Sequence, residues 1–404
     1  MPRLRLVILA ATPTPYFDHL HRRLAAEVPR LDLHVLYTHA RPGWPMTDVP
    51  GVRQKVMHRV ETDWDPSFKA KVENWRLGKR LIGELRRLGP SAVVVNGYAD
   101  PSRWRVLAWC RRNRVPAFAF TDANVAGAQT AGRRAWVKRR YIGLIDTSLA
   151  GWLGCGRLTL GYLQAFGVDP RRVVPAPYEP AYDRIDAMTS EEVARRTAAL
   201  GLPAGRTLAV CSGRMVPSKR HDRALAAFAA VAERRPELDL VLLGDGPEML
   251  RLRAAIPENL AGRVHLPGFV QDERDVFAVY RRSAVLIHVP DHEPWGLVIN
   301  EAAWAGAALV CTDVVGAAAE LLQDGVNGHV VRHGPDEAAT AAAVEALLKT
   351  TDPARLAAYQ AASRNCVAAW REAADPVAGI RQSLHAAGLL PGDDPTTSQD
   401  TSEK

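Results

Sequence analysis

The stretches Ala284-Val-Leu-Ile-His-Val289 and Glu293-Pro-Trp-Gly-Leu-Val-Ile-Asn-Glu301 decide the fold of this 404-residue chain. The first is a mostly apolar run of strand length, and a helical pattern begins near Leu297 in the second. Pro294 disfavours helical geometry at the residue before it, so Glu293 is predicted in a loop between the strand and the helix. A strand, a loop and a helix in this order form the repeating unit of parallel α/β sheets.

The same alternation runs through the rest of the chain. The first half has strands predicted at Leu4–Ala11, Leu31–Leu36, Ala92–Asn96 and Ala117–Phe120 and helices predicted at Tyr16–Val28 and Arg103–Arg114. The second half has strands predicted at Thr207–Cys211, Leu238–Leu243, Val264–Leu266 and Ala307–Cys311 and helices predicted at Asp222–Arg234 and Glu273–Arg282. Such alternation indicates mostly parallel sheets with helices on both faces.

The pattern restarts after a polar, proline-containing stretch at residues 175–180. We therefore predict two Rossmann-like, doubly wound domains, residues 1–180 and 181–370, that face each other across a cleft. Ligands of open α/β folds bind at the carboxyl ends of the strands, so the cleft is the expected binding site. A further helix is predicted over residues 371–390, and the polar tail 391–404 is predicted to be disordered.

The two halves of the chain differ in charge. Residues 1–180 contain 29 Lys and Arg and 14 Asp and Glu, a net charge of +15. Subtraction from the totals of 52 and 44 leaves 23 and 30 for residues 181–404, a net charge of −7. The basic half could attract nucleic acid, an anionic membrane or an anionic substrate, and a solvated Arg-rich surface is the alternative. The segment Gly132-Arg-Arg-Ala-Trp-Val-Lys-Arg-Arg-Tyr141 could lie on an anionic bilayer or form an exposed basic helix.

Several classes of protein are disfavoured. No apolar run reaches the ~18 residues of a membrane-spanning helix, and the apolar start at residues 6–11 is too short for a signal peptide. The five cysteines are widely separated and form no C-x-x-C pair, so we predict reduced core residues rather than disulfides or metal ligands. We expect a cytoplasmic protein, soluble or attached to a membrane surface.

The loop and helix at residues 293–301 offer groups that suit a sugar phosphate. Glu293 lies at the mouth of the expected cleft, and Glu301 lies about one turn into the helix. Carboxylates accept hydrogen bonds from vicinal hydroxyls, while the free amides of a helix start at Trp295–Val298 favour anionic groups.

A second loop, Ser212-Gly-Arg-Met-Val-Pro-Ser-Lys-Arg220, follows the strand Thr207–Cys211. Gly213 permits close approach of the backbone to a ligand, and Arg214 and Lys219 are available as cations. A departing nucleoside diphosphate develops negative charge, which these two side chains could stabilise without a metal. The histidines show no ligand spacing and are interpreted as packed or exposed residues, and only His292, beside Glu293, is a candidate for testing.

These motifs together resemble one family. Over Leu208–Val331 the sequence is similar to the family-4 retaining glycosyltransferases of the GT-B fold. The motifs that carry the resemblance are Ser-Gly-Arg-Met-Val-Pro-Ser-Lys (212–219), Leu-Leu-Gly-Asp-Gly-Pro-Glu (242–248), Leu-Pro-Gly-Phe-Val (266–270), Glu293 with Glu301, and Val-Val-Gly followed by Glu-Leu-Leu-Gln-Asp-Gly-Val-Asn-Gly (314–328).

The resemblance implies a role for each matching residue. Arg214 and Lys219 would hold the donor diphosphate, and Val270 would contact the base through its backbone. Glu301 would bind the ribose, and Glu293 would hold the transferred sugar. The remaining donor contacts implied are Gly213 and the amides of Trp295, Gly296 and Leu297. The resemblance further implies two GT-B domains, C-terminal helices that cross back to the N-terminal domain, and metal-independent transfer with retention.

The N-terminal half departs from the family pattern. A Gly-Gly loop is common after the first strand of the family, but this chain has Thr12-Pro-Thr-Pro-Tyr16, and the family's N-domain histidine has no clear counterpart. Tyr16, Asp122 and Asn124 are therefore the candidates for the acceptor side.

We expect a retaining glycosyltransferase that moves a sugar from a nucleoside diphosphate, UDP in the first instance, to a small or lipid-linked acceptor. In this interpretation residues 1–180 bind the acceptor and residues 181–370 bind the donor. The alternatives are a sugar-nucleotide hydrolase or epimerase of the same fold, and a non-enzymatic protein that binds membrane or nucleic acid. Nucleic acid is not an expected partner of the enzyme.

Overall fold

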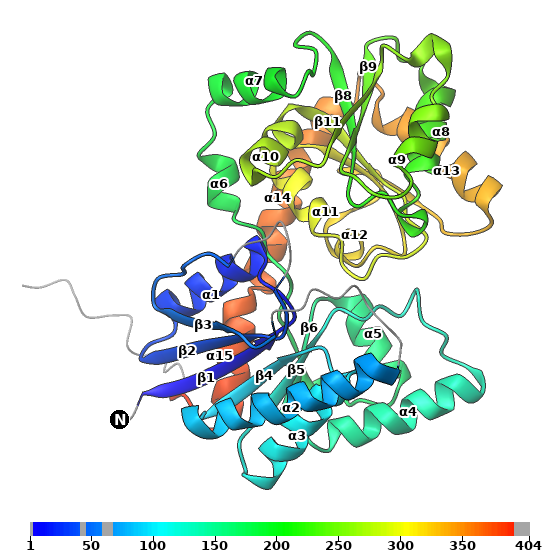
Figure 1. Cartoon of the computed structure of the whole chain (residues 1–404). Coiled ribbons are helices and arrows are strands. Elements are labelled where there is room, and N and C mark those ends of the chain that lie inside the picture. Colours follow the sequence, from blue (N-terminus) through cyan, green and yellow to red (C-terminus); the bar gives the residue numbers. More distant parts are fainter. Residues whose placement is uncertain (1–2, 41–45, 59–67, 392–404) are drawn as a thin grey trace, which may run out of the picture.

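The computed structural model describes residues 3–40, 46–58 and 68–391, which form two α/β domains arranged one above the other (Figure 1). The tail predicted to be disordered lies outside the described residues, apart from Pro391.

The N-terminal domain is built on a seven-stranded parallel sheet with the order β3-β2-β1-β4-β5-β6-β7. Its strands are β1 (Leu4–Ala10), β2 (Leu31–Tyr37), β3 (Val52–Val56), β4 (Ala92–Asn96), β5 (Ala117–Thr121), β6 (Gly151–Gly154) and β7 (Val173–Pro175). The order reverses at β1, as expected for a doubly wound sheet.

Helices cover both faces of this sheet because successive side chains of each strand point to opposite sides. Leu6 and Ile8 of β1 pack with α1 (Pro15–Glu27) and α15 (Pro376–Ala386), whereas Val7 and Leu9 pack with the helices of the other face. Those helices are α2 (Phe68–Leu88), α3 (Pro101–Arg112), α4 (Gly132–Asp146) and α5 (Arg157–Ala165).

The C-terminal domain repeats the plan with six parallel strands in the order β10-β9-β8-β11-β12-β13. Its strands are β8 (Thr207–Ser212), β9 (Leu238–Leu243), β10 (Val264–Gly268), β11 (Ser283–His288), β12 (Ala308–Thr312) and β13 (Gly328–Val331). Its helices are α7 (Ser190–Ala199), α8 (His221–Val231), α9 (Met249–Ala254), α10 (Glu273–Arg282), α11 (Leu297–Trp304), α12 (Gly316–Leu321) and α13 (Asp336–Thr350). The prediction of two doubly wound domains is confirmed.

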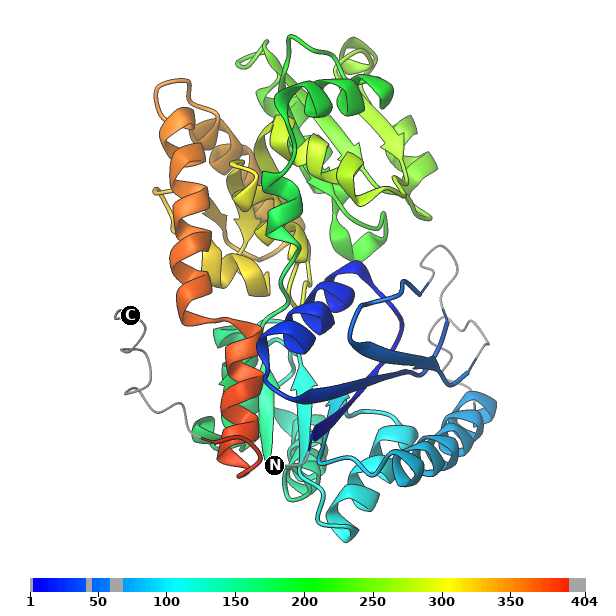
Figure 2. The same ribbon diagram turned by 90° about the vertical axis from the view of Figure 1, so that its left-hand side faces the viewer.

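The chain passes twice between the domains. The first passage runs from β7 through residues 176–181 into α6 (Tyr182–Asp186). In the second, α14 (Leu356–Ala373) descends along the C-terminal domain and α15 continues onto the N-terminal sheet, as Figure 2 shows. Gly379 of α15 lies so close to this sheet that an added Cβ would sit 1.9 Å from the carbonyl oxygen of Pro175. The expected return of the C-terminal helices is confirmed.

Candidate active site

A pocket of about 260 Å³ lies between the two domains, at the carboxyl ends of both sheets. The N-terminal domain and the first passage contribute Tyr16, Asp122 and Tyr178. The C-terminal domain contributes Ser212, Gly213, Arg214, Lys219, His288 and the run Glu293–Val298. The predicted donor and acceptor sides therefore meet in one pocket.

Glu293 is placed by the loop between β11 and α11. Gly296 ends this loop with φ at +86°, and an added Cβ there would lie 3.0 Å from the Cγ atom of Glu293 and from the Cγ1 atom of Val315. Only glycine adopts this left-handed conformation readily and leaves room for both neighbours. The predicted loop position of Glu293 and the helix start at Leu297 are confirmed.

The carboxylate of Glu293 is buried between two nitrogen-bearing side chains. Lys219 forms an ion pair with its Oε2 atom, and the Nε2 atom of His288 lies 3.1 Å from the same oxygen. Burial raises the pKa of Glu293, but the hydrogen bond with His288 and the charge of Lys219 outweigh that effect and lower it to about 2. Glu293 is therefore ionised throughout the neutral range and acts as an acceptor of hydrogen bonds.

The loop after β8 brings Gly213, Arg214 and Lys219 to the other side of the pocket. It packs against the loop after β9, where an added Cβ on Gly244 would lie 2.1 Å from the carbonyl oxygen of Gly213. Arg214 is exposed and, within the described part of the chain, its side chain forms no ion pair or hydrogen bond. Its guanidinium is therefore available to an anionic ligand.

The start of α11 points amides at the pocket. Gly296 is the residue before the helix, and Leu297 and Val298 open it, so their N–H groups have no partner within the helix. Trp295 is buried beside Trp370, and its carbonyl oxygen accepts a hydrogen bond of 2.7 Å from the backbone N–H of Ala317. These contacts of Trp295 hold the backbone that carries the amides in place.

Two predicted donor residues, Glu301 and Val270, do not line this pocket. Glu301 lies one turn into α11, and burial together with the charge of Glu273 raises its pKa to about 8, although the Tyr280 hydroxyl partly opposes this. Val270 follows β10 and is half-buried. Both residues belong to the C-terminal domain, as the other predicted donor residues do, but they lie outside the pocket that Glu293 lines.

The N-terminal side of the pocket is aromatic and acidic. Tyr16 is the second residue of α1 and packs edge-on against Tyr178, with ring centroids 5.1 Å apart. Asp122 follows β5, and its burial and the nearby negative charge of Glu293 raise its pKa. These two predicted acceptor-side residues therefore lie at the pocket.

The third acceptor-side candidate, Asn124, takes another position. Its buried Nδ2 atom donates to the carbonyl oxygens of Glu293 at 3.2 Å and Val314 at 2.7 Å, and its Oδ1 atom accepts from the N–H of Ala126. The side chain therefore joins the two domains behind the pocket.

Sequence reasoning missed His288, Tyr178 and Ser212. His288 is packed, in line with its interpretation, but the contact of this buried ring with Glu293 was not predicted. Its position at the last residue of β11 could have indicated this, because strand ends border the cleft. His292 is exposed, and its ring fills the space beside Gly127 of the other domain.

Comparison with a protein-family model adds to this geometry. Residues 194–364 match the family described as "Glycosyl transferases group 1", and they include every pocket residue of the C-terminal domain.

No cluster of three or more His, Cys, Asp or Glu side chains suited to a metal occurs in the described ranges.

Relatives are similar to parts of this chain. The chain is 28% identical over 286 residues to a GDP-mannose-dependent alpha-mannosyltransferase of Mycolicibacterium smegmatis, covering 66% of each chain. It is 37% identical over 128 residues to an exopolysaccharide phosphotransferase of Streptomyces coelicolor, which is 31% of this chain. The chain spans only 13% of the length of the second relative and just under two thirds of the first.

Solved structures show the fold. The Anabaena protein HepE, in complex with UDP and glucose, superposes with a TM-score of 0.69 at 15% identity and covers 96% of this chain and 100% of its own. The fold of the chain is therefore GT-B. The family match supports the glycosyltransferase class for the domain that holds Glu293.

Proposed function

We propose that this chain is a retaining glycosyltransferase of family 4 that transfers a sugar from a nucleoside diphosphate sugar to an acceptor hydroxyl. The observation that carries the proposal is the position of Glu293, ionised and held by Lys219 and His288 beside the first amides of α11. A fixed carboxylate next to a set of free amides suits a ligand that is part polyol and part phosphate.

The proposed chemistry divides among the pocket residues. Glu293 and the amides of Gly296 and Leu297 hold the sugar, and Arg214 and Lys219 stabilise the charge that develops on the diphosphate. The acceptor oxygen forms a bond to the anomeric carbon on the face from which the diphosphate oxygen leaves. The hydroxyl proton passes to the departing diphosphate, so no enzymatic nucleophile is needed.

The donor base and the ribose lie beyond the pocket in this proposal. Glu301 binds the ribose hydroxyls and the backbone of Val270 contacts the base. UDP is the proposed nucleotide, which fits the UDP complex of the Anabaena protein, and GDP-mannose is the comparison donor because the mycobacterial relative is named for it. Tyr16 and Asp122 contact the acceptor, which is a small molecule or a lipid-linked one.

The test is a transfer assay with a panel of nucleoside diphosphate sugars, after thermal-shift screening for the donor that stabilises the protein. Glu293→Gln should lower kcat/KM by on the order of 100- to 1000-fold, because it removes a charge from the sugar site. Glu337→Gln, an exposed carboxylate on α13, is the matched control and should be unchanged.

The outcomes separate the rival functions. Donor consumption without a glycosylated product would indicate a hydrolase, and a changed sugar stereocentre in the recovered donor would indicate an epimerase. Undiminished transfer by Glu293→Gln would contradict the site. Transfer should continue in EDTA, because the proposed charge stabilisers are Arg214 and Lys219, and a loss restored by Mg²⁺ would contradict that role.

A further inference from the structure

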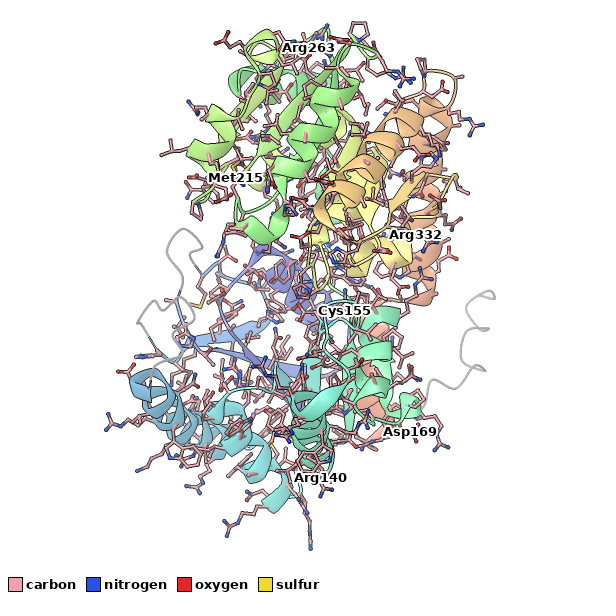
Figure 3. All side chains as sticks on the ribbon, turned by 90° about the vertical axis from the view of Figure 1, so that its right-hand side faces the viewer. Arg140, Cys155, Asp169, Met215, Arg263 and Arg332 are labelled. Atoms are coloured by element: carbon pink, nitrogen blue, oxygen red, sulfur yellow. The ribbon has the colours of Figure 1, made fainter. Side chains whose placement is uncertain are left out.

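Helix α4 carries a surface that the proposed reaction does not use. Its inner side packs Ala135, Ile142 and Ile145 into the core of the N-terminal domain. Its outer side faces away from the C-terminal domain, and Figure 3 places Arg140 near the far end of the molecule. The helix follows β5, whose loop begins with the pocket residue Asp122.

The outer side of α4 is apolar as well as basic. Trp136, Val137 and Leu144 are 62%, 58% and 65% exposed. Together with Arg133 and Arg140 they are spaced by three, four, seven and eleven residues, which places all five on one stripe of the helix. Soluble surfaces rarely group large apolar side chains in this way without a partner.

The charge of this helix is uncompensated. Its five cations are Arg133, Arg134, Lys138, Arg139 and Arg140, and none of them forms an ion pair with a described residue. The one acidic residue of α4, Asp146, is bound instead to Arg172 and to the indole N–H of Trp152. The guanidinium of Arg140 lies 5.5 Å from the ring centroid of Trp136, so charge and apolar surface are in direct contact.

The aromatic surface extends to the neighbouring helix. Trp104 of α3 is 40% exposed and packs edge-on against Tyr141 of α4, with ring centroids 5.7 Å apart. Tryptophan and tyrosine favour the boundary between lipid headgroups and acyl chains, where the ring is buried and its polar edge stays wet.

We propose that the outer stripe of α4 docks on the surface of an anionic lipid bilayer. The cations bind lipid phosphates, while Trp136, Val137 and Leu144 insert at the level of the acyl boundary. Nucleic acid would bind the cations but would give Val137 and Leu144 no apolar partner. A bilayer explains both the charge and the exposed apolar residues of the stripe. None of the helices in the described ranges combines the length and the apolar character of a membrane span.

Docking is tested by flotation of the full chain with vesicles, in the absence of any sugar donor. Vesicles of phosphatidylcholine alone are compared with vesicles in which about one third of the lipid is phosphatidylglycerol, at about 0.05 M and about 0.5 M NaCl. The protein should float with the anionic vesicles at low salt and bind the neutral ones much more weakly. Equal binding to both vesicles would overturn the proposal, as would binding to neither.

Two double variants separate charge from insertion. Arg133→Gln with Arg140→Gln should lower partitioning about 25-fold, since each cation contributes about fivefold. Trp136→Ser with Leu144→Ser should lower it roughly tenfold and leave the salt dependence in place. The matched control is Leu250→Ser with Arg253→Gln, an apolar and a basic residue that are both exposed on α9, and this variant should bind as the parent does.

A thermal melt verifies that each variant is folded, and the single substitutions replace any double variant that is not. A labelled oligonucleotide provides the competing outcome. Oligonucleotide binding that is lost in the arginine variant and intact in the Trp136 and Leu144 variant, with no vesicle binding, would overturn the bilayer in favour of nucleic acid. Because no donor is present, failure of docking is distinguishable from failure of the proposed transfer.

Discussion

Glu293 and Glu301 are eight residues apart in one loop and helix, yet their environments act on them in opposite directions. The hydrogen bond of His288 and the charge of Lys219 lower the pKa of Glu293 to about 2, in spite of its burial. Burial and the charge of Glu273 raise the pKa of Glu301 to about 8. At neutral pH the carboxylate of Glu293 is therefore charged, whereas the carboxyl group of Glu301 is mostly protonated.

The raised pKa of Glu301 makes the stability of the protein depend on pH. Unfolding restores an ordinary pKa near 4.5, so the folded state binds the proton more tightly between pH 4.5 and about 8. Stability is therefore lost as pH rises through this window. Glu301→Gln carries no such proton and should be more stable than the parent by on the order of 2 to 4 kcal/mol at about pH 9, with little difference at about pH 4.5.

Thermal melts of the parent and of Glu301→Gln across this pH range check the prediction. Glu337→Gln is the control, because that carboxylate is exposed on α13. A constant difference in melting temperature between the parent and Glu301→Gln at every pH would contradict the raised pKa. The same variant should bind the donor more weakly, if Glu301 holds the ribose as proposed.

At the scale of elements, the turn into α11 determines where Glu293 lies. Gly296→Ala would force a side chain into the left-handed region and against Glu293 and Val315. Gly306→Ala imposes the same kind of strain at φ +94°, but its added Cβ would meet nothing within 4 Å. Each variant should lose about 1 kcal/mol of stability from the backbone alone.

Only Gly296→Ala should impair the reaction, with kcat/KM lowered about tenfold or more because the carboxylate is displaced. Melting curves and transfer kinetics of the two variants give the comparison. Equal activity of both variants would show that the turn does not position Glu293.

The sequence predicted elements well where an apolar run or a helical period was long. β9 and α10 were predicted at their observed bounds, whereas the helix predicted over residues 371–390 is observed as the end of α14 followed by α15. The short strands β3, β6, β7 and β13 were not predicted. Val52–Val56, at the edge of the sheet, has three consecutive polar residues between its two valines, and Gly151–Gly154 is half glycine. Their pairing is therefore set by neighbouring strands rather than by their own pattern.

The site was predictable to a similar degree. Lys219 in one motif and Glu293 and Gly296 in another were predicted at the cleft from spacing and resemblance, and the structure places all three at one pocket. The contact of His288 with Glu293 depends on how β11 ends, and the bond from Asn124 depends on how two domains meet. The end of a strand indicates that His288 borders the cleft, but no local pattern identifies Glu293 as its partner or encodes the bond of Asn124.

At the scale of the whole molecule, the domains are joined by more than the two passages of the chain. The buried carboxylate of Glu179, in the first passage, accepts hydrogen bonds from Arg23 of α1 at 2.6 Å and from Arg371 of α14 at 2.8 Å. Near the pocket, the Oε1 atom of Glu320 accepts a 2.6 Å bond from the backbone N–H of Arg157 at the start of α5. These contacts fix the relative position of the sheets whose carboxyl ends border the pocket.

Asn124 also joins the two domains. One of its acceptors is the backbone carbonyl oxygen of Glu293, the residue proposed to hold the sugar. Asn124→Ala should lower kcat about tenfold, the cost of about one net hydrogen bond in the assembled pocket. The KM for the donor should change little, because the proposed donor residues all belong to the C-terminal domain. Asn113→Ala, which removes a single side-chain bond to the carbonyl oxygen of Trp109 at the end of α3, is the control.

Transfer kinetics and solution X-ray scattering distinguish two roles for Asn124. If it joins the domains, the variant should combine the lower kcat with a larger radius of gyration, because fewer contacts hold the sheets together. If it contacts the acceptor instead, as a side chain at the end of β5 could, the KM for the acceptor should rise while the radius of gyration stays that of Asn113→Ala. The bonds to Glu293 and Val314 occupy both hydrogens of the amide, which is why the first result is expected.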